Sequence, residues 1–214
     1  MRKLPPCLAA LALAALVASP AVAAPPPLES LPAVLRCGDA DGFQALADAL
    51  YTDDWPGELS PTETDGQPLG YTGFELARPV AFHGRQVGEI GFVQEWIVAP
   101  LPRDEARALA AELGMERAPI KSTEQHFKFL QGDPGPLFSV FSLSDAVALM
   151  FTGEPQESET LYAGCTYRET TREEFLAAAG QADEILASAR QRILDVLNGR
   201  ASPEDEAESP PDAP

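Results

Sequence analysis

The stretch FELARPVAFHGRQVGEIGFVQEWIVA, residues 74–99, carries the strongest strand signal in the chain. Four apolar residues of its first half alternate on one face: Phe74, Leu76, Val80 and Phe82. His83 and Gly84 then suit a two-residue hairpin turn. The return strand, residues 85–99, is expected to place another apolar set on one face: Ile90, Phe92, Trp96 and Val98. The stretch therefore predicts an antiparallel hairpin.

Two irregularities are expected within this hairpin. Val87 is out of phase with Ile90, which predicts a bulge at Gly88. Pro79 cannot donate to a strand ladder, so the first strand is expected at a sheet edge. A second hairpin follows at residues 125–131 and 137–143, joined by the turn-forming GDPGP, and a single strand is expected at residues 160–169.

Helical patterns lie between these strands. A short helix capped by Asp41 precedes the first hairpin, another covers residues 102–113, and a third begins at Ser144 and stops at Gly153. A long C-terminal helix runs from about residue 172 to 198, with Thr171 and Glu174 forming a capping box. Consecutive hairpins favour an α+β fold. We expect one domain over residues 37–200, with an antiparallel sheet of about five strands, helices mainly on one face and the long C-terminal helix.

The two ends of the chain have compositions unlike the middle. Residues 1–23 combine Arg2 and Lys3, an apolar run at residues 8–17 and a small-residue site ending at Ala23, which together predict a secretory signal peptide. About 10 apolar residues are too few for a membrane anchor, which needs about 20. Residues 24–36 are expected to form an extended lead-in. The proline-rich acidic tail, residues 201–214, is expected to be disordered.

Cleavage of the signal would leave two cysteines, Cys37 and Cys165. An isolated pair in an oxidising compartment normally forms a disulfide, so we expect these two to be bonded. The alternative is a free Cys165 thiol acting as a nucleophile beside a histidine, but pairing explains both cysteines together. Arginine outnumbers lysine and alanine is abundant, which hints at a GC-rich bacterial genome. The localisation expected is periplasmic or secreted.

The chain is strongly acidic, with 15 basic and 33 acidic residues and a formal charge of −18. Without Arg2 and Lys3 the charge becomes −20. Such a charge argues against binding nucleic acid or anionic lipid, both of which need basic surface. It is compatible with a basic protein or peptide partner, although acidity also serves solubility alone. No stable membrane anchor is expected after signal cleavage.

Few residues are candidates for a catalytic or ligand-binding role. His126 lies on the polar face of its strand with Glu124, its nearest acid–base partner in the sequence, while Phe127 and Phe129 are expected in the core. GDADG at residues 38–42 resembles the start of a calcium loop but lacks the later ligands, so its aspartates are interpreted as a turn and a helix cap. No cofactor or metal site is predicted, and no catalytic residue is assigned.

Two classes of function remain. The first is a non-enzymatic exported binding module that uses the acidic loop at residues 51–72, with Asp53, Asp54 and Trp55 as its site, against a basic partner. The second is an envelope enzyme, such as a hydrolase, that uses His126 with nearby carboxylates. A concave site where His126 meets carboxylates would favour the enzyme, and a flat acidic or aromatic patch the binding module.

Overall fold

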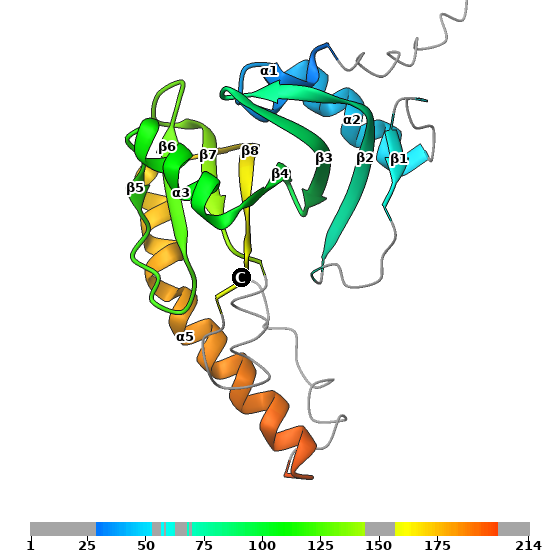
Figure 1. Cartoon of the computed structure of the whole chain (residues 1–214). Helices are drawn as coiled ribbons and strands as arrows, with labels where there is room; N and C mark the ends of the chain where they lie inside the picture. The colour runs from blue at the N-terminus through cyan, green and yellow to red at the C-terminus, as the bar shows by residue number, and fades with distance from the viewer. Residues whose placement is uncertain are drawn as a thin grey trace, which may run out of the picture.

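The computed structural model describes residues 29–52, 57, 59–62, 68, 70–143 and 157–200. Its elements are α1 (Leu31–Leu35), α2 (Ala40–Thr52), β1 (Leu59–Pro61), β2 (Tyr71–Phe82), β3 (Arg85–Val93), β4 (Trp96–Pro102), α3 (Arg103–Glu112), β5 (Glu116–Arg117), β6 (Gln125–Phe129), β7 (Gly135–Phe141), β8 (Thr160–Thr170) and α5 (Arg172–Leu197). The strands form one antiparallel sheet in the order β1-β2-β3-β4-β8-β7-β6-β5 (Figure 1). The α+β class and the long C-terminal helix are confirmed.

The sheet has eight strands, so the expectation of about five was too low. The expected return strand over residues 85–99 is in fact two strands, β3 and β4, which meet at a turn where Gln94 has a φ of 52°. The other two additions, β1 and β5, are three and two residues long. Segments this short carry too little periodicity to be recognised before their pairing partners are known.

The first hairpin turns where expected, at His83 and Gly84, whose φ values of 48° and 78° are the left-handed pair that a tight hairpin turn uses. The irregularity lies in β2 between Glu75 and Val80, opposite the predicted position at Gly88. β2 is not the outermost strand, because β1 pairs with it. That pairing covers only residues 74–76, so the half of β2 that contains Pro79 has no further strand beside it in the described part of the chain.

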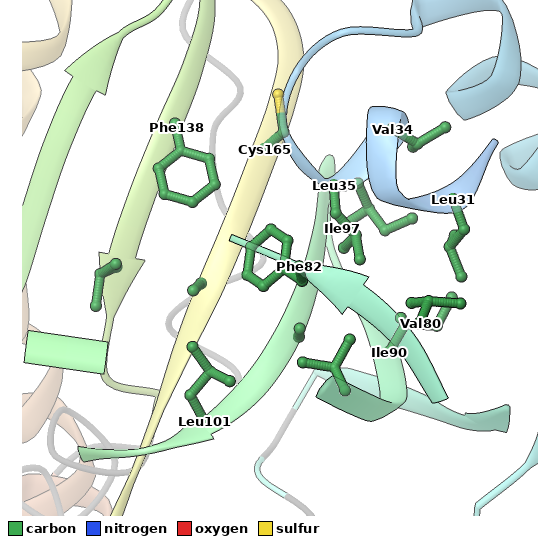
Figure 2. Close-up of a cluster of buried hydrophobic side chains, with 14 of the residues drawn as sticks. Leu31, Val34, Leu35, Val80, Phe82, Ile90, Ile97, Leu101, Phe138 and Cys165 are labelled. Carbon is green, nitrogen blue, oxygen red and sulfur yellow. The ribbon is translucent and has the colours of Figure 1, made fainter. Parts of the chain in front are cut away.

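Both faces of the sheet are used. One face carries the main core, in which side chains of β4 and β8 such as Ile97, Leu101 and Cys165 meet α1, α2 and α3 (Figure 2). The hairpin tip folds over this core, so that the ring of Phe82 lies 6.1 Å from that of Phe138 on β7. The opposite face receives α5 near β6 and β7, where the ring centroids of Phe175 and Phe127 are 4.5 Å apart.

The predicted disulfide between Cys37 and Cys165 is confirmed, with 5.4 Å between the two Cα atoms. Cys37 follows α1 in a left-handed conformation, with a φ of 63°. The amides of Cys37 and Gly38 donate to the carbonyls of Val34 and Ala33, which closes the helix as a Schellman motif. Residues 31–35 are therefore helical, unlike the expected extended lead-in, because Pro32 sits in the first turn, where proline is tolerated.

The predicted caps of α5 are confirmed, and the predicted cap of α2 is corrected by two positions. Thr171 and Glu174 form the predicted capping box of α5, and Gly199, with a φ of 66°, ends that helix. Asp41 was expected to cap α2, but Asp39 does so, accepting a 2.9 Å hydrogen bond from the amide of Gly42. Asp41 lies inside the first turn. The helix expected from Ser144, the signal segment and the acidic tail fall outside the described residues.

Candidate functional site

The site predicted from the sequence, Asp53, Asp54 and Trp55, lies outside the described residues. The structure describes α2 up to Thr52 and β1 from Leu59. A binding site in the acidic loop therefore stays a prediction.

A groove of about 540 Å³ lies over the sheet face that carries α5. It is lined by Gln94, Glu95, Trp96, Leu137, Thr166, Arg168, Glu169, Thr170, Glu174, Phe175 and Ala178. These residues come from the β3–β4 turn, from β4, β7 and β8, and from the first two turns of α5. The groove thus forms where three distant parts of the chain meet.

The floor of the groove is a row of paired residues across three strands. Trp96 of β4 pairs with Thr166 of β8, which pairs in turn with Leu137 of β7. Thr166 and Leu137 are buried, whereas Trp96 is partly exposed, with its ring 5.3 Å from that of Phe141. Phe175 adds an apolar wall from α5. An indole on such a floor offers a large apolar surface to a ligand.

The rim of the groove is acidic. Glu95, Glu169 and Glu174 face one guanidinium, that of Arg168, which leaves a formal charge of −2. Arg168 pairs with Glu95 at 3.4 Å, and both side chains are largely exposed. The pKa of Glu174 is lowered because it accepts hydrogen bonds from the backbone and side chain of Thr171, so this carboxylate stays charged in mildly acidic solution. The rim therefore attracts cations.

The sequence pattern placed Trp96 on the wrong face. It was expected on the face of Ile90 and Phe92, but Phe92 pairs with Ile97 on the core face, while Trp96 pairs with Val93 on the opposite one. The turn at Gln94 and Glu95 reverses the chain and changes the phase of the side chains. The signal that was missed is this polar pair inside an otherwise apolar run.

His126 belongs to a different site, an ion cluster beside α3. Its Nε2 lies 3.2 Å from an oxygen of Glu124, whose side chain is only 8% exposed. Arg107 donates to the same carboxylate at 2.7 and 2.9 Å, and Arg103 donates at 3.0 Å. Hydrogen bonds from Arg107, helped by one from His126, lower the pKa of Glu124 to about 2. The carboxylate is therefore charged and fully engaged at neutral pH.

This cluster joins three parts of the chain. Arg103 also donates from Nε to the carbonyl of Ser158 at 2.5 Å, which connects α3 to the segment that leads into β8. Glu157 lies 3.8 Å from Arg103 on the exposed side. Because two guanidiniums surround the one carboxylate in contact with His126, the arrangement serves structural cohesion better than proton transfer. The sequence paired His126 with Glu124 correctly but gave no sign of the arginines.

The burial of the residues that follow His126 on β6 agrees only in part with the prediction. Phe127 is buried against α5, as predicted, but Phe129 is only partly buried. Lys128, between these two phenylalanines, is half-buried and donates from Nζ to the carbonyl of Leu113 at the end of α3. No cluster of three or more histidine, cysteine, aspartate or glutamate side chains in the described part of the chain is arranged to hold a metal ion.

Comparison of the chain with protein-family models, with curated proteins and with solved structures finds no match. Within the described residues, no helix combines the length and the apolar character needed to cross a bilayer. A disulfide in the core is typical of proteins that fold in an oxidising compartment.

Proposed function

We propose that this protein is an exported, non-enzymatic binding module, periplasmic or secreted, that recognises a basic segment of a protein or peptide in the Trp96 groove. Export is supported by the signal-like composition of residues 1–23 and by the core disulfide. The observation that carries the binding proposal is the groove itself, with an apolar floor at Trp96 and an excess of carboxylates on its rim.

The chemistry of the groove selects its ligand. An aliphatic or aromatic side chain buries its surface against Trp96 and Phe175, and aromatic anchors of this kind carry much of the affinity of protein interfaces. A lysine or arginine beside that side chain meets Glu169 or Glu95 at the rim. Since these carboxylates are solvent-exposed, the electrostatic part of the affinity falls as salt rises.

Tryptophan fluorescence gives a direct test. The chain has two tryptophans, Trp55 and Trp96, so a Trp55→Phe variant reports the groove alone. Linear peptides selected from a displayed random library on the mature protein should carry a lysine or arginine next to a large apolar residue. Their titration should shift the Trp96 emission, and Glu95→Gln/Glu169→Gln should weaken binding about tenfold, or 1.4 kcal/mol.

The matched control is Glu75→Gln/Glu105→Gln, which removes the same two charges from exposed positions of β2 and α3, outside the groove. It should leave binding unchanged. Selected peptides that bind without changing the Trp96 emission, and equally well to both glutamine variants, would place the binding site elsewhere.

The acidic loop predicted from the sequence is the second location for the same function. If Trp55→Ala/Asp53→Asn/Asp54→Asn abolishes peptide binding while the Trp96 emission does not respond, the loop is the site. We do not extend the proposal to hydrolysis by His126, because the carboxylate beside it is held by Arg103 and Arg107.

A further inference from the structure

The C-terminal half of α5 extends past the sheet that supports its first half (Figure 1). Among the described residues, the last hydrogen bonds that join α5 to another part of the chain are at Asp183, whose carboxylate accepts from the amides of Lys121 and Ser122 at 3.0 and 2.9 Å. Residues 184–197 continue beyond it for about 21 Å at the rise of an α-helix. This half-helix is a projecting surface of the molecule.

The half-helix carries all the large apolar side chains that are exposed in the described part of the chain. They are Ile185 at 60%, Val196 at 53% and Leu197 at 74% exposure. Single exposed apolar residues are ordinary, but three on one projecting helix form a concentration that indicates an interaction surface.

Its charge differs from that of the rest of the molecule. Its residues 184–197 include two acidic side chains, Glu184 and Asp195, and two arginines, Arg190 and Arg192. The net charge of the half-helix is therefore zero, whereas the whole chain carries −18. Two copies of so acidic a protein repel one another over much of their surfaces, and a half-helix with balanced charges adds little to that repulsion.

We propose that two copies of the protein associate through this half-helix, antiparallel and about a two-fold axis at Ser188. A shallow groove of about 300 Å³ runs along this side of α5, lined by Gln181, Glu184, Ile185, Ser188 and Arg192. Glu184 and Arg192 stand four residues before and after Ser188. A two-fold axis at Ser188 therefore sets Glu184 of each copy opposite Arg192 of the other.

Two further side chains, Ser188 and Ile185, fit the same arrangement. Ser188 is small, which lets the two helices approach closely at the crossing point. Ile185 comes to lie against the aliphatic stem of Arg192 of the second copy, which covers its exposed surface while the guanidinium reaches Glu184. The interface thus buries an apolar residue and makes two symmetric ion pairs.

Charge reversal tests this geometry. Sedimentation of the mature, disulfide-bonded protein should show a reversible dimer at concentrations up to about 1 mM. Glu184→Arg and Arg192→Glu should each weaken it about tenfold or more, because each replaces two attractive pairs by two repulsive ones. The double variant restores opposite charges and should dimerise within about threefold of the unmodified protein.

Asp48→Arg is the matched control, since it makes the same change of charge at an exposed position of α2 and should leave the dimer unchanged. Circular dichroism of each variant establishes that it is folded. A monomer at every concentration would overturn the proposal, and so would a dimer that is indifferent to both single reversals. Open-ended oligomers that are weakened by Glu169→Gln would indicate instead that the helix of one copy enters the Trp96 groove of the next.

Discussion

The hydroxyl of Tyr167 donates a 2.8 Å hydrogen bond to the carbonyl of Val34, 133 positions earlier in the chain. The same oxygen accepts a 3.1 Å hydrogen bond from the amide of Asp39, and the ring stacks on Phe43 at 4.8 Å. Burial raises the pKa of Tyr167 to about 12, so it remains a donor at neutral pH. One side chain of β8 thus holds the end of α1 and the start of α2, two positions from the disulfide at Cys165.

Replacing Tyr167 with phenylalanine removes both hydrogen bonds and keeps the stacked ring. We expect a loss of about 1–3 kcal/mol in the free energy of unfolding, because the Val34 carbonyl and the Asp39 amide lose their partner. Urea denaturation of the oxidised protein measures this. A loss below about 0.5 kcal/mol would mean that water replaces the hydroxyl without cost.

Because Cys37 has a left-handed conformation, glycine at this position is expected to give a more stable protein than alanine. Removing the disulfide, which spans 128 positions, is expected to cost about 4–5 kcal/mol by the chain-entropy relation. Among disulfide-free proteins, Cys37→Gly/Cys165→Ala should be about 1 kcal/mol more stable than Cys37→Ala/Cys165→Ala, because glycine adopts a φ of 63° without strain. Equal stability of the two variants would show that Cys37 relaxes once the bond is absent.

Gly91 is required by a close approach. A Cβ atom at this position would lie 2.0 Å from Cε2 of Tyr71, whose hydroxyl donates to Glu89 at 2.7 Å. Gly91→Ala is therefore expected to cost about 3 kcal/mol through overpacking. Gly180→Ala, on the exposed side of α5 with open space around it, should instead stabilise the protein by about 0.5–1 kcal/mol.

A double variant separates this contact from a general intolerance of alanine. If Tyr71 is the obstacle, Gly91→Ala should cost much less in a Tyr71→Ala background. If the losses of the two single variants simply add in the double variant, the cost of Gly91→Ala comes from the backbone of β3 and not from contact with Tyr71.

His83 predicts a dependence of stability on pH. Burial, with the charge of Arg36, lowers the pKa of His83 in the folded state, so the unfolded chain binds a proton more readily. Its contribution is therefore complete above about pH 6.5 and is lost as the pH falls through the lowered folded pKa. Asparagine also tolerates a φ of 48°, so His83→Asn removes the titrating group without straining the backbone. The free energy of unfolding of this variant, relative to that of the unmodified protein, should rise as the pH falls from 8 to 5. A constant difference would contradict this.

Glu124 predicts a dependence of the same sign at more acidic pH. Its folded pKa of about 2 lies below its ordinary value, so its contribution is complete above about pH 4.5 and is lost as the pH falls toward 2. Glu124→Gln should cost about 3–5 kcal/mol at pH 7, because it removes the buried carboxylate that pairs with the buried guanidinium of Arg103. The difference should shrink below pH 4. Glu116→Gln, which breaks an exposed pair with Arg172, should change stability little at any pH.

Features that depend on neighbours along the chain were predictable from the sequence. The left-handed pair at His83 and Gly84 sets the first hairpin turn, Thr171 and Glu174 begin α5, and Gly199 ends it, because turns and caps involve residues a few positions apart. The disulfide was also predictable, but by counting, since the expected removal of the signal segment leaves two cysteines, which have one pairing available.

Only the tertiary structure decided how these pieces combine. β8 joins the two hairpin systems by pairing with β4 on one side and β7 on the other, across separations that periodicity does not encode. That pairing brings Trp96, Thr166 and Leu137 into one row and so creates the groove. Likewise, Arg103 and Arg107 reach Glu124, the residue before β6, only because α3 packs against β4, β7 and β8. Strand order and ion pairing between distant elements depend on packing and on backbone hydrogen bonds. A strand has the same local sequence pattern whichever strand it pairs with, so the pattern does not identify the partner.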